Sequence, residues 1–188
     1  MNFLYPKLRW RSVRWLLRSA FTGALVAGCY GVVHDQITFG ICPEYFTRLK
    51  FIQFHWADVG LPDRIFVAQI GFLASWWVGF IGGWFIGRVA PEQKPAAHAW
   101  RQTLRGLGMM LCFTIIGSFG GYFFGLLHEP EYGQWSYFAA GGVSDLPAFV
   151  RVAYIHNGSY LGGFIGLVAV LVYLKKGLKS LPAPAQAT

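Results

Sequence analysis

The hydrophobic positions of this chain gather into four long stretches separated by shorter polar segments. The stretches cover about residues 15–33, 65–87, 107–127 and 152–174. Each is close to the roughly 20 apolar residues that a helix needs to cross a hydrocarbon core about 30 Å thick. The pattern therefore predicts an all-α integral membrane four-helix bundle that forms a single domain over residues 1–188. The Pro- and Ala-rich end, residues 178–188, predicts a disordered tail.

A small residue recurs at every fourth position of the first and third stretches, and each series ends in a histidine followed by a carboxylate. The first series is Gly23, Ala27, Gly31, His34 and Asp35, and the second is Gly117, Gly121, Gly125, His128 and Glu129. The second and fourth stretches match in the same way, with Ser75 and Gly79 corresponding to Ser159 and Gly163. We interpret this pattern as two tandem two-helix repeats, about 15–87 and 107–174, related by a parallel pseudo-two-fold axis along the bilayer normal.

These small residues predict how the helices pack. Lipid supplies little hydrophobic drive between helices, so Gly, Ala and Ser stabilise a bundle by letting backbones approach closely. We expect the first and third spans to form the central pair, with the second and fourth around them. On this arrangement, His34 and Asp35 approach His128 and Glu129 at the symmetry axis.

Composition supports a membrane location. The chain has 188 residues, of which 55% are hydrophobic and 13% charged, and its mean hydropathy is +0.43. This leaves too few polar side chains to cover a water-soluble domain of that size.

The net charge is +8, and the distribution of the charged residues along the chain indicates the membrane topology. Basic clusters precede the first span, separate the second from the third, and follow the fourth, whereas seven of the eight acidic residues lie in the two remaining loops. The positive-inside rule then predicts a bacterial inner (plasma) membrane protein with cytoplasmic N- and C-termini and outer loops at about 34–64 and 128–151. The clusters suit anionic lipid rather than nucleic acid.

The run Val26-Ala27-Gly28-Cys29 resembles a lipoprotein cleavage box. The basic region before it extends to Arg18, which is long for a signal peptide, and the matching helix has no cysteine. We therefore expect no lipid attachment at Cys29.

Both outer loops are dense in aromatic residues, which favour the headgroup region. We expect these loops to lie on the outer interface as a cap over the bundle, with an interfacial turn or a short re-entrant segment after Asp35.

The polar residues expected near the outer surface form a candidate site. They are His34, Asp35, Glu44, His128, Glu129, Glu131 and His156, with His55 and Asp145 close by. Imidazole and carboxylate together suit iron, zinc, copper(II) or manganese, and two histidines could serve as axial haem ligands. Ionisable groups near hydrocarbon are costly and call for a partner or a role. The alternative is structural, because a histidine near a helix C-terminus also stabilises the final carbonyls.

Four motifs resemble a known family. They are His34-Asp35-Gln36-x-Thr38, Glu44-Tyr45-Phe46-Thr47, Ala74-x-Trp76-Trp77-Val78-Gly79 and His156-x-x-Ser159-Tyr160-x-Gly162-Gly163. Over about residues 20–170 the chain resembles an uncharacterised family of small bacterial four-span inner-membrane proteins. The resemblance implies the fold and the membrane, and it implies no activity, cofactor or substrate.

Three functions remain open from the sequence. The first is a non-catalytic subunit, scaffold or assembly factor, which agrees with the lack of phosphate-loop, H-E-x-x-H, C-x-x-C and nucleophile-elbow motifs. The second is binding of a transition metal or haem at the paired His-carboxylate motifs. The third is a small oligomeric channel or carrier with a path lined by Gln69, His156 and Asn157. The expected partners are the lipid bilayer, other membrane proteins or further copies of the chain.

Overall fold

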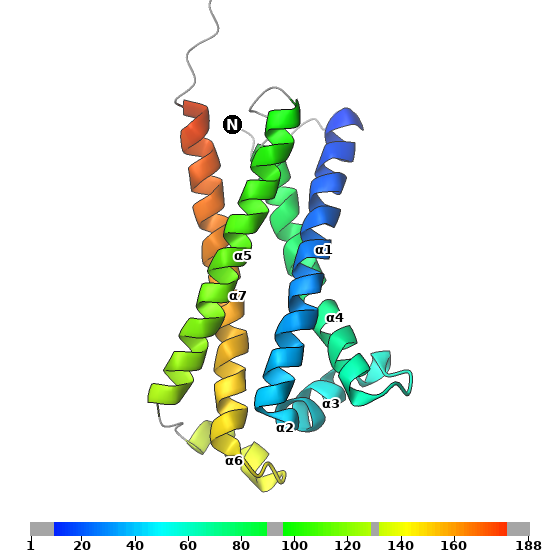
Figure 1. Cartoon of the computed structure of the whole chain (residues 1–188), viewed down its shortest axis with the longest axis vertical. Helices are drawn as coiled ribbons and strands as arrows, with labels where there is room; N and C mark the ends of the chain where they lie inside the picture. The colour runs from blue at the N-terminus through cyan, green and yellow to red at the C-terminus, as the bar shows by residue number, and fades with distance from the viewer. Residues whose placement is uncertain (1–9, 90–95, 129–131, 180–188) are drawn as a thin grey trace, which may run out of the picture.

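Four long helices form the body of the protein. The computed structural model describes residues 10–89, 96–128 and 132–179. The long helices are α1 (Trp10–Ile41), α4 (Asp63–Val89), α5 (Ala96–Leu127) and α7 (Leu146–Lys179), and no strand occurs among the described residues. All four are long and apolar enough to cross a membrane. The chain is therefore an all-α four-helix bundle with the character of a multi-pass membrane protein (Figure 1).

The helices are longer than the predicted spans. At 1.5 Å per residue, a helix of 32 residues such as α1 is about 48 Å long, well beyond the hydrocarbon thickness. Helix α1 continues through His34 and Asp35, which were expected to follow its end, and stops at Cys42. Cys42 has an extended backbone (φ −148°, ψ 94°) because the next residue is Pro43, which disfavours helical backbone before it. Of the predicted tail, residues 178 and 179 belong to α7, and the rest lies outside the described residues.

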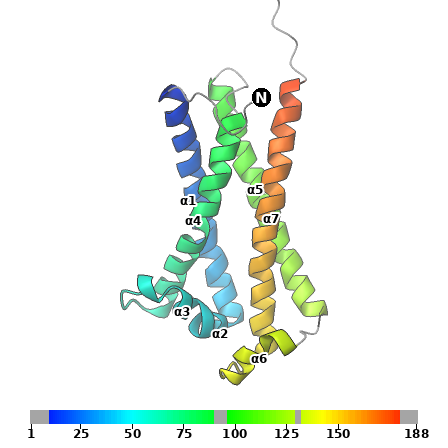
Figure 2. The same cartoon turned by 180° about the vertical axis from the view of Figure 1, so that it is seen from behind.

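The bundle consists of two hairpins, α1 with α4 and α5 with α7 (Figures 1 and 2). Glycines make the contact in both. A Cβ on Gly23 would overlap the carbonyl oxygen of Gly79, and one on Gly117 would overlap the carbonyl oxygen of Gly158. The expected central pair, α1 with α5, is wrong, because the closest small-residue contacts lie within each hairpin rather than between the two.

The contacts inside the hairpins follow different registers. The sequence alignment matches Gly79 with Gly163, yet Gly117 packs against Gly158 and Gly162, while Gly163 faces Thr114. The remaining small residues of the predicted interface also lie at helix contacts: Ala27 against Gly79, Gly31 against Gly71 and Ser75, Gly121 against Tyr154, and Gly125 against Arg151. The shared chemistry of the hairpins therefore does not extend to a shared register.

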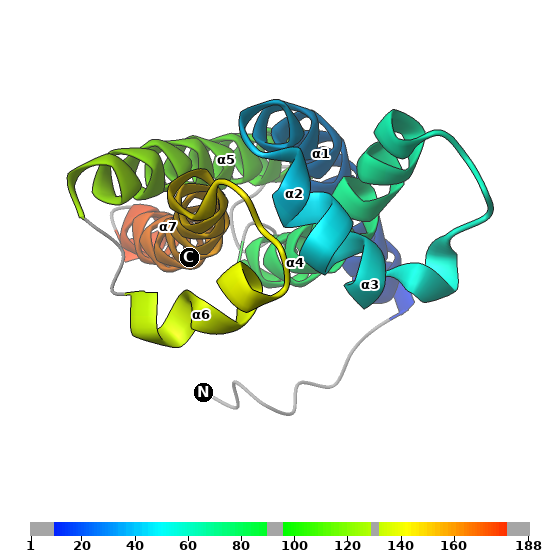
Figure 3. The same ribbon diagram turned by 90° about the horizontal axis from the view of Figure 1, so that it is seen from below.

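Short helices lie across one end of the bundle (Figure 3). They are α2 (Pro43–Tyr45), η1 (Phe46–Lys50), α3 (Phe51–Gln53), η2 (His55–Ala57) and α6 (Tyr132–Ala140). We call this layer, residues 42–57 and 132–145, the cap. Phe46 and Phe149, both fully buried, belong to a core cluster that joins the cap to α7. Helix α1 begins and α7 ends at the opposite end of the bundle (Figure 1).

Candidate metal centre

Three potential metal ligands meet directly beneath the cap. His34 and Asp35 come from α1, and His156 comes from α7, so the cluster joins the two hairpins. One ligand atom from each residue lies within 4.8 Å of the others. The three residues are 9%, 3% and 6% exposed. A charged or titratable group this deeply buried requires a partner.

Helix geometry explains why these residues converge. Because α1 does not end at residue 33, His34 and Asp35 stay on an ordered helix under the cap. Helix α7 begins at Leu146, earlier than the predicted 152, and runs antiparallel to α1 (Figure 1). His156 therefore lies at the same level as His34, and the two rings meet edge to face with centroids 4.8 Å apart.

Both ring nitrogens of His156 have polar neighbours. Its Nδ1 is 2.9 Å from the carbonyl oxygen of Val152, one turn earlier in α7, and can only donate to that oxygen. Its Nε2 is 3.2 Å from Oδ1 of Asp35. Tyr45 of the cap stacks on the imidazole, with centroids 5.0 Å apart and planes at 30°. The ring is thus fixed by a backbone hydrogen bond on its own helix and covered by an aromatic side chain.

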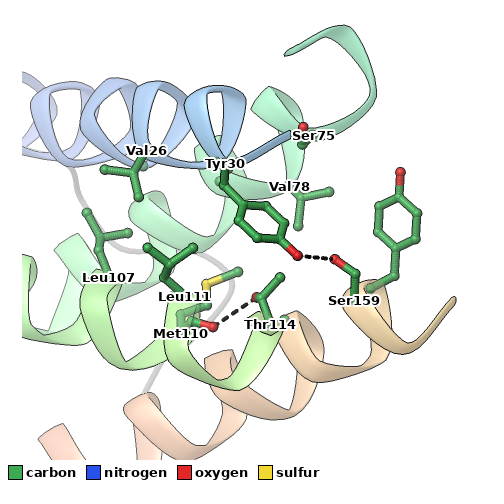
Figure 4. A pocket seen from close by; sticks show the side chains of 14 residues that line it. Val26, Tyr30, Ser75, Val78, Leu107, Met110, Leu111, Thr114 and Ser159 are labelled. Carbon is green, nitrogen blue, oxygen red and sulfur yellow. Dashed lines mark hydrogen bonds between the residues drawn. The ribbon is translucent and has the colours of Figure 1, made fainter. Parts of the chain in front are cut away.

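His34 is held by a hydroxyl cluster. Its Nδ1 lies 3.0 Å from Oη of Tyr30. That oxygen is 2.8 Å from Oγ of Ser118 on α5 and 3.1 Å from Oγ of Ser159 on α7. Figure 4 shows Tyr30 reaching across from α1 toward Ser159 at the edge of a cavity. Tyr30 therefore connects α1 with both helices of the second hairpin.

Two atoms of the cluster lack hydrogen-bond partners. Among the described residues, nothing bonds to Nε2 of His34 or to Oδ2 of Asp35, although both atoms are buried. An unsatisfied buried polar atom costs about 1–3 kcal/mol, more if it is charged. Such atoms in a native site need an explanation, and coordination of an ion is one.

Lys50 lies close to this cluster in the cap. It is 8% exposed, and its Nζ lies 5.8 Å from the ring centroid of Tyr45 and 5.9 Å from that of Phe54. Burial lowers the pKa of Lys50, and the negative charge of Asp35 partly opposes that effect. Burial also raises the pKa of the Tyr45 hydroxyl, with Asp35 contributing in the same direction. Tyr45 is therefore a neutral cover over the cluster.

Glu44 stands apart from the three ligands. Its carboxylate accepts hydrogen bonds from the backbone N–H groups of Ser144 and Asp145 and from the Ser144 hydroxyl, at 3.0 to 3.2 Å. These donors immediately precede α7, and they lower the pKa of Glu44. Asp145 caps the same helix, because its Oδ1 accepts from the N–H of Ala148 at 2.9 Å. Glu44 thus fastens the two parts of the cap together.

His128 does not approach His34, which corrects the expectation from the repeat. It is exposed, and its ring stacks on Phe124 with centroids 4.0 Å apart. The reason is that α5 packs on α7 rather than on α1, so its cap-side end lies away from α1 (Figures 1 and 3). Glu129 and Glu131 lie outside the described residues.

The three residues expected to line a transport path lie in different parts of the structure. His156 belongs to the ligand cluster, whereas Asn157 is exposed at a groove on the outer surface of α5 and α7. Gln69 donates to the carbonyl oxygen of Ala57 at 2.8 Å. His55 is exposed, and its Nδ1 lies 3.0 Å from the carbonyl oxygen of Ile52.

A small cavity of about 60 Å³ lies between the hairpins, on the side of Tyr30 facing away from the cap. It is lined mainly by apolar side chains such as Val26, Val78 and Leu111, with Thr114 and Ser159 as polar contributions (Figure 4). This volume is enough for one or two water molecules.

The geometry suits a single ion better than haem. His34 and His156 are in edge contact, and the Asp35 carboxylate lies against Nε2 of His156, so no flat gap remains between the imidazoles for a porphyrin. Two imidazole nitrogens and one carboxylate oxygen match the donors that first-row transition metals and zinc prefer.

The sequence names His34, Asp35 and His156 among its candidates, and the structure brings these three together. The sequence does not indicate which residues hold them in place. Tyr30 and Ser118 belong to none of the predicted motifs, Tyr45 is part of an aromatic outer-loop motif, and Ser159 is predicted at a helix contact. The sequence gives little indication of their roles, because each is a single polar or aromatic residue in an apolar or aromatic segment.

Comparison with known proteins gives no further guide: the chain matches no family model, no curated protein and no solved structure.

Proposed function

We propose that this multi-pass membrane protein binds one divalent transition-metal ion at His34, Asp35 and His156. The observation that carries the proposal is the surplus of acceptors in the cluster. Since Nδ1 of His156 donates its proton to Val152, a neutral imidazole turns the lone pair of Nε2 toward the carboxylate of Asp35. Two acceptors 3.2 Å apart repel each other unless a cation lies with them.

A metal ion would also satisfy the other two atoms. Nε2 of His34 and Oδ2 of Asp35 lack partners among the described residues, and both are metal donors. Metal-bound histidines usually donate the remaining ring N–H to a carbonyl, carboxylate or water, as His156 does here to Val152. One ion would therefore account for all the unpaired donor atoms of the cluster.

The donor set supports zinc, iron(II), manganese(II) or copper(II) over calcium or magnesium, because two of the three donors are imidazoles. Three protein ligands leave at least one coordination position for water or a small ligand. The ion would also bridge the two hairpins, since α1 supplies two ligands and α7 supplies one. A role in holding the hairpins at a fixed spacing follows from that placement.

A metal-free scaffold or assembly subunit is the second candidate. The 3.2 Å contact between His156 and Asp35 also fits a protonated imidazole paired with a carboxylate, which would join the hairpins without an ion. This pairing leaves the two unpartnered atoms unexplained, which is why the metal is preferred.

The test is metal analysis of protein purified without chelators and then exposed to zinc, iron(II), manganese(II) and copper(II). We expect about one metal per chain in the wild type and in His128→Gln, and loss of the metal in His156→Gln. His128 is the matched control because it is an exposed histidine outside the cluster. A wild-type protein that retains no metal under any of these conditions would leave the scaffold as the surviving function.

The placement of the basic clusters supports a bacterial inner membrane location with cytoplasmic termini, which puts the metal site on the periplasmic side. Reporter fusions test this. A reporter active only in the periplasm should give signal when inserted after Gly60 and none when attached at the C-terminus, and the reverse pattern would place the site inside.

A further inference from the structure

The hydroxyl cluster beside His34 assigns a positioning role to Tyr30. This inference rests on the proposed metal site, because it concerns how one of its ligands is prepared. We infer that Tyr30, with its proton directed to the second hairpin, holds His34 in the tautomer that leaves Nε2 free for the ion.

The hydroxyl protons of the cluster determine which atom of His34 is protonated. Oγ of Ser118 lies 3.1 Å from the carbonyl oxygen of Thr114, one turn earlier in α5, and because that oxygen can only accept, we assign the single hydroxyl proton of Ser118 to this bond. On this assignment, Oγ of Ser118 accepts from Tyr30 at 2.8 Å, which is shorter than the contacts of Tyr30 with His34 and Ser159. The proton of Tyr30 is then committed to Ser118.

With its proton committed, the Tyr30 oxygen is an acceptor for its other neighbours. Ser159 donates to it across 3.1 Å, and His34 must donate from Nδ1 across 3.0 Å. A neutral imidazole with its proton on Nδ1 has a lone pair on Nε2. That nitrogen is the buried atom of His34 with no other partner among the described residues.

The opposite direction of the hydrogen bond between Tyr30 and His34 would prevent His34 from binding the ion. If Tyr30 donated to Nδ1, the imidazole proton would move to Nε2, and an N–H would occupy the coordination position. If Ser118 alone is lost, the hydroxyl of Ser159 can rotate and accept the proton of Tyr30 instead. Losing both serines leaves His34 as the acceptor that remains in the cluster. Tyr30 would then weaken metal binding at His34 instead of supporting it.

The decisive variants are Ser118→Ala with Ser159→Ala, and the same double variant carrying Tyr30→Phe as well. We expect the double variant to bind zinc about 10–100-fold more weakly, the usual effect of losing the hydrogen bond that orients a metal ligand. Adding Tyr30→Phe removes the hydroxyl that blocks Nδ1, so we expect part of that affinity to return. Thr114→Val is the matched control, since Thr114 bonds to its own helix and is expected to bind zinc as the wild type does. Competition titration with a coloured zinc chelator measures all four proteins.

A merely structural role for Tyr30 predicts the opposite order, with the triple variant weakest. That order would overturn the inference, as would a double variant with wild-type affinity. A second readout needs no metal. Nitrogen-15 NMR of labelled histidine at pH 8 should show His34 protonated on Nδ1 in the metal-free wild type and on Nε2 in the double variant. If zinc does not bind at all, the proposed function fails, while the NMR result still decides the role of Tyr30.

Discussion

The contacts inside each hairpin depend more on close backbone approach than the contacts between the hairpins do. Inside, backbones touch at glycines such as Gly23 with Gly79 and Gly117 with Gly158. Between them, the described contacts include polar side chains, a cavity and the ligand cluster. The glycine contacts depend on close fit between backbones. Between the hairpins, an apolar cluster that includes Ile86, Leu107 and Val170 packs in the same way, but the contacts near the cap also depend on protons and charge. We therefore expect the hairpins to behave as stable units whose mutual spacing responds to an ion.

The largest effect should come from filling a glycine contact. Gly79→Leu forces apart α1 and α4, because even a Cβ at this position overlaps the backbone of Gly23 and the side chain of Ala27. We expect a loss of about 3 kcal/mol or more in stability, at or beyond the upper end for overpacked cores. Gly120→Leu is the control, since beyond its two neighbours and the nearby backbone of its own helix no described atom lies within 4 Å of a Cβ there. Thermal unfolding in detergent measures both, and equal losses would contradict the comparison.

Metal removal should act on the spacing between hairpins and spare the hairpins themselves. Spin labels at Val33 and Leu161 report the distance from α1 to α7, and labels at Val33 and Ile65 report the distance inside the first hairpin; all three side chains are exposed. We expect chelation to broaden only the first distance distribution. Restoring metal at 100 times its dissociation constant should add about 2.7 kcal/mol of stability. Equal broadening of both pairs would show that the hairpins are not separate units.

Replacement of Lys50 should strengthen metal binding. Its ammonium group is buried near Asp35, so it repels a second cation. We expect Lys50→Met to raise zinc affinity about tenfold, which corresponds to about 1.4 kcal/mol. Arg48→Met is the control, because Arg48 is an exposed cation of the same cap segment. Weaker binding in Lys50→Met would mean that Lys50 supports the site rather than opposing the ion.

Glu44→Gln should have the smallest effect. A carboxylate beside the first N–H groups of a helix contributes about 0.5 kcal/mol when it is exposed. Because the pKa of Glu44 is lowered in the folded protein, this contribution is present above its ordinary pKa and is lost as the pH falls through the lowered value. Unfolding curves from pH 7 to pH 3 should show a slightly weaker acid dependence in the variant. An identical acid dependence would indicate that the hydrogen bonds to Ser144 and Asp145 contribute nothing.

The sequence predicted the four helices and their membrane character, because these depend on the length and composition of continuous segments. It also identified His34, Asp35 and His156 as candidates. It paired His34 with the wrong histidine, since a small residue at every fourth position identifies a contact face but not the helix that fills it. The sequence also ended α1 too early, at the polar pair His34-Asp35, although Pro43 is the residue that stops the helix.

The hydroxyl cluster could not be predicted for a related reason. Tyr30, Ser118 and Ser159 lie on three different helices, and their contact depends on the axial level at which those helices pass one another. A shift of one residue along α7 would turn Ser159 away from Tyr30. Hydropathy and small-residue spacing do not predict the axial positions of the helices relative to one another to within one residue.

The aromatic cover formed by Tyr45 has a kinetic consequence. Its ring stacks on His156 with the planes at 30°, and it follows Glu44, whose carboxylate is hydrogen-bonded to Ser144 just before α7. If the segment that carries Tyr45 has to move before an ion can leave His156, exchange with the surroundings would be slow even where affinity is modest. The metal found in the purified protein would then be a record of which ion was available while the chain was folding.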